Sequence, residues 1–108
     1  MALSNDTVLV TEDDVKLALG NTTGIKEDWI TFAVAATIAY VVDLKGQLLT
    51  WPWDYKLGAT KIAAGLVRDA ASPAIAEPFS SGSVARRATD VEIEQLLKTG
   101  RFQRPAVG

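Results

Sequence analysis

The residues available for chemistry in this chain are carboxylates, lysines, arginines and hydroxyls, because its 108 residues include no cysteine and no histidine. Disulfides, thiolate metal sites and the usual imidazole general base are therefore excluded. Asp54, Asp69 and Glu77 are candidates for an acid–base pair, but no spacing in the sequence places two of them together. No phosphate-binding loop of the form GxxxxGK[ST] occurs. The sequence thus indicates no catalytic residue, cofactor or metal site, and we do not expect an enzyme.

A run of three acids, Glu12, Asp13 and Asp14, is the other group of residues that could form a site, in this case for a metal ion. It lies in the stretch VTEDDVKLALGN, which predicts a short helix that begins after Thr11 and stops at Gly20. Asp14 follows Thr11 by three residues, in the position of a capping box. The acids therefore complement the positive end of the helix dipole, and a metal site is the less favoured alternative.

The second predicted helix, residues 26–44, contains the uncharged stretch between Asp28 and Asp43. This stretch is too short to cross a membrane, which takes about 20 apolar residues, so a membrane protein is the weaker alternative. Its apolar residues occupy every side of the helix, and a helix of this kind is expected to be buried on every side. A chain of 108 residues can hardly surround it alone. We therefore expect neighbouring copies of the chain to cover part of it, with subunit contacts at Trp29, Phe32, Ala36 and Tyr40.

A tryptophan–proline segment, WPW, leads into a third predicted helix over residues 53–71. Trp51 and Trp53 suit a half-buried subunit interface, although tryptophans that plug the ends of a helical bundle fit the pattern too. Gly58 and Gly65 lie seven residues apart on one face of this helix. Glycine there costs about 1 kcal/mol in helix propensity, and the close approach of another helix is a reason to accept it. We expect both glycines in the subunit interface.

The remainder of the chain predicts an excursion, a closing helix and a tail. The excursion, residues 73–88, contains prolines, glycine and serines, and a short hairpin about Ser81–Gly82 is one possibility. The closing helix is expected over residues 89–99 with a capping box formed by Thr89 and Glu92. The fold is therefore predicted to be mainly α: one domain over residues 1–99, built as a small bundle of about four helices with an extended loop or short β-hairpin before the last helix. Residues 100–108 are predicted to be a flexible docking tail.

The order of these parts resembles the small head-to-tail adaptor (connector, or head-completion) proteins of tailed bacteriophages. The likeness is carried by the acidic helix TEDDVKLALG, the long apolar helix, the WPW hinge, a third helix ending in VRDAASP, the EPFSSGSVA segment and the closing RFQRP. It covers most of the chain and consists of element order and spacing, without a catalytic motif. The family pattern has a longer excursion with a short sheet segment, so this chain departs from it there.

This resemblance implies a structural virion protein of the phage neck, made in the host cytoplasm. The expected partners are further copies of the chain in a dodecameric ring, a portal protein, and a stopper or tail-completion protein. DNA passes through the ring only as cargo, and no membrane is involved. The excursion and tail would then contact these partners, through Phe79, Arg86, Arg87, Arg101, Phe102 and Arg104, although solvated surface is an equal alternative for the four arginines.

A small nucleic-acid-binding module is the alternative function. Arginines flank a predicted helix in VARRATDVEIEQLLKTGRFQR, as they would around a recognition element. A DNA-binding domain usually has a strong basic surplus, whereas this chain has a net charge of −2. The charge is also unevenly distributed: residues 1–28 are acidic and residues 86–108 are mildly basic. This distribution suits head-to-tail contacts between subunits, and a chance distribution of charges is an equal alternative. The opening MALSNDTVLV lacks the basic and long apolar parts of a signal peptide.

Overall fold

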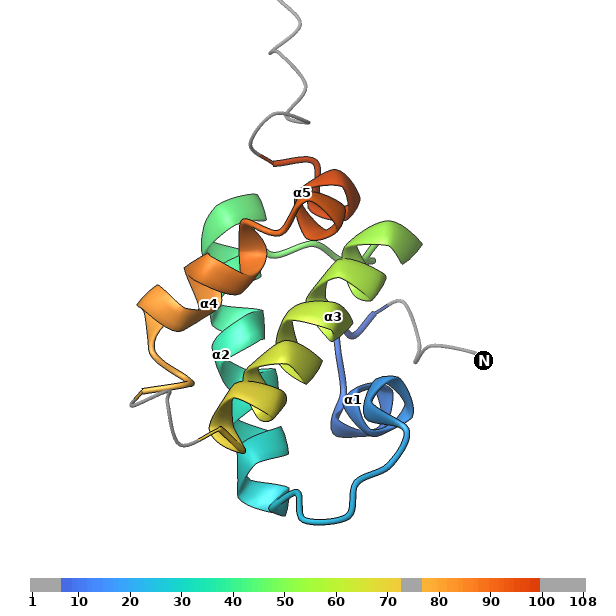
Figure 1. Ribbon diagram of the computed structural model, residues 1–108. Helices are drawn as coiled ribbons and strands as arrows, with labels where there is room; N and C mark the ends of the chain where they lie inside the picture. Colours follow the sequence, from blue (N-terminus) through green and yellow to red (C-terminus); the bar gives the residue numbers. More distant parts are fainter. Residues whose placement is uncertain (1–6, 73–76, 100–108) are drawn as a thin grey trace, which may run out of the picture.

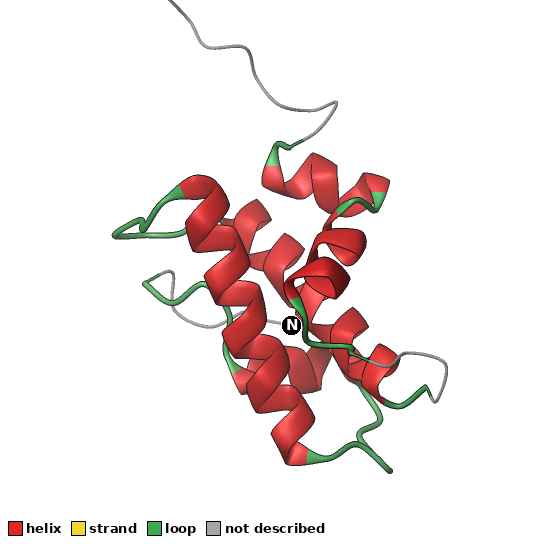
Figure 2. Cartoon of the chain, turned by 90° about the vertical axis from the view of Figure 1, so that its left-hand side faces the viewer, coloured by secondary structure: helices red, strands yellow, loops and turns green. Residues whose placement is uncertain are grey.

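The computed structural model describes residues 7–72 and 77–99, and within these ranges all regular structure is α-helical (Figures 1 and 2). The predicted mainly-α class is therefore confirmed, and the helices pack into one compact unit. Their bounds are α1 (Glu12–Leu19), α2 (Glu27–Lys45), α3 (Trp53–Ala70), α4 (Ser81–Ala88) and α5 (Val91–Leu97). Helices α2 and α3 agree with the ranges expected from the sequence to within one residue at each end.

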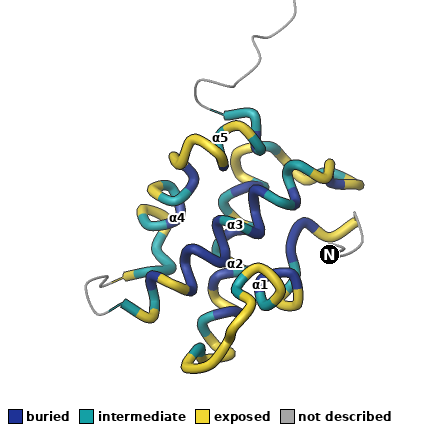
Figure 3. Tube along the Cα trace, turned by 45° about the vertical axis from the view of Figure 1, so that its right-hand side comes forward, coloured by how far each residue is buried: buried dark blue, intermediate teal, exposed yellow. Residues whose placement is uncertain are grey.

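Helix α3 is the centre of the fold and packs against each of the other four helices. Its small residues let those neighbours approach on several sides, and most of its length is buried (Figure 3). The large side chains Ile62, Leu66 and Val67 are fully buried and fill the space between the helices. Removing a large aliphatic side chain from such a position typically costs 2–5 kcal/mol, so α3 carries much of the stability of the fold.

The two glycines of α3 mark the closest helix contacts. A Cβ atom placed on Gly58 would lie 3.0 Å from Leu97 Cδ2 of α5, and one placed on Gly65 would lie 3.0 Å from Arg87 Cδ of α4. The close approach inferred from the sequence is therefore present. In both cases the neighbouring group belongs to the same chain, and both glycines are buried in its core rather than exposed to another subunit.

Helix α1 begins as the sequence predicted. The Asp14 backbone N–H donates to Thr11 Oγ1 at 3.2 Å, and the Thr11 N–H donates to Asp14 Oδ2 at 3.0 Å. This reciprocal pair is the capping box, which satisfies two backbone donors that the first helical turn leaves free. Gly20 follows with a φ of 73°, a conformation that favours glycine, and ends the helix.

Helix α2 buries one stripe and leaves its opposite side open. The buried residues are Ile30, Ala33, Thr37 and Val41, which face α1, α3 and α4. The outer stripe contains Phe32, Ala35 and Ala39, all of them exposed. One chain therefore covers only part of the apolar circumference of α2, and the coverage of the rest by neighbouring copies remains a prediction.

The expected hairpin about Ser81–Gly82, or extended loop, is wrong. Residues 81–88 of the predicted excursion form α4 instead, where the resemblance implied a short sheet segment. The helix is possible because the Ser80 side chain accepts a hydrogen bond from the Ser83 N–H and caps it. Val84 and Ala88, one turn apart, are buried against the rest of the chain and hold it in place. The serines and Gly82 favoured a turn in the sequence analysis, whereas the apolar spacing of Val84 and Ala88 was the weaker signal for a helix.

The predicted capping box of Thr89 and Glu92 is also wrong. Thr89 ends α4, and its hydroxyl donates to the Arg86 carbonyl at 2.6 Å. Asp90 is the N-cap of α5 instead, because its side chain accepts from the Glu92 N–H at 3.0 Å. The closing helix is accordingly shorter than the range 89–99 expected from the sequence.

Replacing Gly58 with alanine tests the packing of α5 on α3. We expect Gly58→Ala to lower the free energy of unfolding by about 1 kcal/mol, because overpacking against the buried Leu97 outweighs the better helix propensity of alanine. The measurement is urea unfolding followed by circular dichroism. Gly82→Ala is the matched control, since its nearest atom, Ser80 Oγ, would lie at an ordinary 3.9 Å; it should be neutral or stabilising. Equal stability of the two variants would contradict the close contact.

Candidate functional site

An apolar depression in the surface lies between α2 and α4. It encloses about 470 Å³ and is open to solvent. Its lining is mainly apolar with one carboxylate, and consists of Ala36, Ala39, Tyr40 and Asp43 from α2 together with Phe79, Ser81 and Val84 from the α4 side. We call this the α2–α4 hollow. An apolar depression with a few polar groups is the form that binding sites usually take.

An aromatic pair borders the same surface. The rings of Phe32 and Phe79 meet edge to face, with centroids 5.7 Å apart and planes at 60°. Phe32 is nevertheless 53% exposed, and Phe79 is half-buried. The pair therefore fixes the start of α4 against α2 while still presenting apolar surface to solvent.

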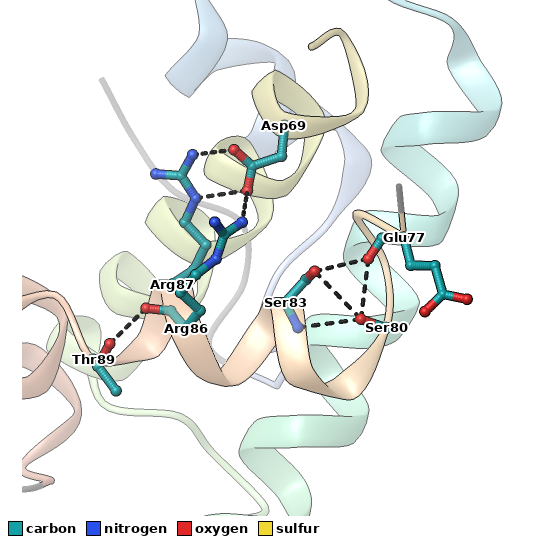
Figure 4. A network of polar contacts seen from close by, with 7 residues as sticks. All are labelled: Asp69, Glu77, Ser80, Ser83, Arg86, Arg87 and Thr89. Atoms are coloured by element: carbon teal, nitrogen blue, oxygen red, sulfur yellow. Dashed lines mark hydrogen bonds and ion pairs between the residues drawn. The ribbon is translucent and has the colours of Figure 1, made fainter. Parts of the chain in front are cut away.

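The segment before α4 is fixed by hydroxyl hydrogen bonds (Figure 4). The hydroxyls of Ser80 and Ser83 both donate to the Glu77 carbonyl, at 3.0 and 2.7 Å. The Ser83 N–H donates to Ser80 Oγ at 3.2 Å. These bonds join Glu77, Ser80 and Ser83 in one local network. Phe79 and Ser81, which line the hollow, lie between these residues in the sequence and are held in place by them.

The other end of α4 is bound to α3 through an ion pair of Asp69 with two arginines (Figure 4). Arg87 forms a two-pronged contact with Asp69, through Nε to Oδ2 at 2.9 Å and through Nη2 to Oδ1. Arg86 Nη2 donates to the same Oδ2 at 3.2 Å. The Asp69 side chain is only 10% exposed, whereas both guanidinium groups reach solvent.

These contacts shift the pKa values of Asp69 and Arg87. The hydrogen bond from Arg87 lowers the pKa of Asp69, burial partly opposes this, and the charges of Arg87 and Arg86 lower it further. The same hydrogen bond raises the pKa of Arg87. A carboxylate held in this way is a weak proton acceptor, and its arrangement favours a structural role in joining α3 to α4.

The other two carboxylates considered for acid–base chemistry lie elsewhere. Asp54 Oδ2 pairs with Lys98 Nζ at 3.1 Å, and Glu77 is exposed and contributes its carbonyl to the serine network. No group of three or more potential metal ligands occurs in residues 7–72 and 77–99. No helix within the same ranges has the length and hydropathy needed to cross a membrane.

The residues predicted for subunit contacts fall into four groups. Ala36, Tyr40 and Phe32 come together at or beside the α2–α4 hollow. Trp29 is half-buried near the start of α2, with Lys26 Nζ 5.5 Å from its ring centroid. Three residues are buried inside the chain and offer no surface for another subunit: Trp51, Gly58 and Gly65. Trp53, by contrast, is 65% exposed at the first position of α3.

The residues predicted for partner docking are divided as well. Phe79 lines the hollow, whereas Arg86 and Arg87 are engaged by Asp69. Arg101, Phe102 and Arg104 lie outside the described residues. Sequence reasoning missed Asp43, Val84 and the pairing of Asp69. The i, i+4 spacing of Val84 and Ala88 was a signal for α4, but no local signal links Asp69 to arginines 17 and 18 residues away.

Comparisons with known proteins give no match to any family model, curated protein or solved structure.

Breaking the α3–α4 ion pair is expected to destabilise the chain in a pH-dependent way. Asp69→Ala should lower the free energy of unfolding by about 2 kcal/mol at neutral pH, because it removes charge-assisted hydrogen bonds to two guanidinium groups. The folded-state pKa of Asp69 is depressed, so its contribution is complete above the ordinary aspartate pKa of about 3.9 and is lost as the pH falls through the folded value.

Urea unfolding at a series of pH values checks this expectation. The difference between wild type and Asp69→Ala should be constant down to about pH 4 and shrink below it. Asp43→Ala is the control, because Asp43 is an exposed carboxylate on α2, and it should change stability by less than about 0.5 kcal/mol. A difference for Asp69→Ala that does not shrink in acid would show that the ion pair contributes nothing to stability.

Proposed function

We propose that this chain is a structural subunit of a head-to-tail adaptor ring in the neck of a tailed bacteriophage. The ring would lie between the portal protein and the stopper or tail-completion protein, with DNA passing through it. The observation that carries the proposal is the open apolar side of α2, where Phe32, Ala35 and Ala39 are exposed in a helix expected to be covered.

Apolar surface on the open side of α2 becomes more stable when another protein surface covers it and removes it from water. Phe32 lies in the second turn of the long helix and is 53% exposed. Contiguous exposed apolar surface on a small domain usually marks a site of protein association. A side of one helix that faces outward is well placed to meet another copy, and small residues such as Ala35 and Ala39 permit close helix contact.

The resemblance in element order supports the same assignment. The capped acidic helix, the long apolar helix, the WPW hinge and the small-residue helix follow one another as α1, α2, the connecting segment and α3. Helix α4 departs from the extended segment that the resemblance implies. The docking contact to the portal or the stopper is therefore assigned to Arg101, Phe102 and Arg104, which lie outside the described residues.

The nucleic-acid-binding alternative is less well supported. Its central basic residues, Arg86 and Arg87, both pair with Asp69, so their charge is partly balanced within the chain. Binding to phosphates relies on cations that release counterions from the nucleic acid. Two arginines already engaged by a carboxylate are poorly suited to that role.

Assembly of the purified chain tests the proposal. We expect sedimentation velocity and native mass spectrometry at rising protein concentration to show a multi-copy species, and negative-stain images to show rings. Phe32→Glu should prevent assembly, because a charge on the open side of α2 would be desolvated in the contact. Leu17→Glu is the matched control: Leu17 is 49% exposed on α1, so the same charge is added at similar exposure on a different helix.

The role in the virion is tested in the phage that carries the gene. Deleting the gene should leave DNA-filled heads and free tails that do not join, and the wild-type chain supplied in trans should restore joined particles. Joined, infectious particles in the absence of the gene would contradict the proposal, as would a chain that stays monomeric at every concentration and on virions.

A further inference from the structure

We propose that Trp53 of one copy, together with Leu49 four residues before it, inserts into the α2–α4 hollow of the next copy. The occupant of the hollow is thus a second copy of this chain. This inference rests on the proposed ring and deepens it, because it names the two surfaces through which successive subunits make contact.

The inserting surface is the most prominent apolar projection of the described residues. Leu49 is 94% exposed, and Trp53 is 65% exposed. Trp51, between them in the sequence, is buried, and Pro52 has the fixed backbone that suits the start of a helix. Trp53 is therefore presented from a segment anchored on one side by a buried indole and on the other by the first turn of α3, so little order has to be gained on binding.

The chemistry of the receiving surface suits an indole. The α2–α4 hollow, about 470 Å³, is lined mainly by small and apolar side chains with the rings of Tyr40 and Phe79. An indole has a large apolar body, which buries roughly 150–250 Å², and a single N–H donor. Buried tryptophans usually satisfy this donor with a hydrogen bond, and tryptophan is among the residues that dominate binding at interfaces.

Asp43 is the acceptor that the hollow supplies. It lies on the lining, is exposed, and forms no hydrogen bond or ion pair with any other residue in the described part of the chain. A bond from Trp53 Nε1–H to this carboxylate would be charge-assisted and would fix the register of the contact. The apolar lining would thus contact the ring system of the tryptophan, and the single carboxylate would accept a hydrogen bond from its N–H group.

The two surfaces lie on different sides of the molecule. In Figure 1 α3 begins on the right, whereas α4 lies on the left. The hollow is lined by residues of α2 and α4 and of the segment before α4. A contact between two different patches is heterologous: each copy uses one patch for the preceding copy and the other for the following copy. Such contacts repeat from copy to copy and form a ring when the rotation closes.

Site-directed cross-linking tests the contact directly, because the chain has no cysteine of its own. Leu49→Cys and Ala39→Cys, which place thiols four residues before Trp53 and in the lining of the hollow, are mixed and oxidised. We expect a disulfide-linked dimer from the mixture, little from either variant alone, and a ladder of multimers from the double variant. Leu17→Cys mixed with Ala39→Cys is the control for random collision and should give no dimer. Equal yields in the control mixture, or a dimer from Leu49→Cys alone, would overturn the contact.

Binding measurements test the chemistry of the contact. Trp53→Ala should weaken self-association tenfold or more in sedimentation equilibrium, whereas Val91→Ala, which truncates an exposed apolar residue of α5, should leave it unchanged. Trp53→Phe keeps an apolar ring but removes the N–H donor. Its effect and that of Asp43→Ala should not add when the two are combined, because each removes the same hydrogen bond. Fully additive losses would overturn the hydrogen bond, and unchanged association of Trp53→Ala would overturn the whole inference.

The outcomes separate this inference from the proposed function. If the wild-type chain forms rings but Trp53→Ala assembles normally and the cysteine pair does not cross-link, the named contact is wrong and the ring proposal stands. If Phe102→Ala abolishes assembly in place of Trp53→Ala, the hollow receives the tail rather than the tryptophan. If the wild-type chain never associates, both proposals are wrong.

Discussion

The close packing of four helices around α3 is the constraint on which the rest of the structure depends. Gly58 and Gly65 let α5 and the Arg87 side chain of α4 approach the α3 backbone, and the large residues Ile62 and Leu66 fill the remaining space. Helix α2 packs against α3, α1 and α4, and it buries only the stripe that faces them. The open apolar side of α2 follows directly from this arrangement.

The ion pair of Asp69 has a second, more local consequence. It joins α4 to α3 at one end, while Ser80 and Ser83 fix the start of α4 through the Glu77 carbonyl. With both ends held, α4 stands beside α2 at a distance that leaves a hollow rather than a filled contact. Two of the arginines that the sequence offers for docking, Arg86 and Arg87, are thereby used within the chain.

The sequence predicted the long elements well because their signals are local and redundant. Helix α3 is defined by apolar periodicity over about five turns, α2 by its long uncharged apolar stretch, and α1 by a capping box within four residues. Short helices are harder to predict from the sequence, because they offer fewer local signals. Helix α4 has two buried apolar residues, Val84 and Ala88, among serines and arginines, and the choice between Thr89 and Asp90 as the cap of α5 depends on which hydroxyl or carboxylate the preceding helix has already engaged.

The sequence alone determined the helical class, the bounds of α2 and α3, the cap of α1 and the lack of cysteine and histidine chemistry, because each of these depends on residues within a few positions of one another. Only the tertiary structure decided which stripe of α2 is buried, that the close neighbours of Gly58 and Gly65 belong to the same chain, and that Asp69 holds Arg86 and Arg87. Such pairings join residues that are distant in the chain, and the packing of whole helices, rather than any local pattern, brings them together.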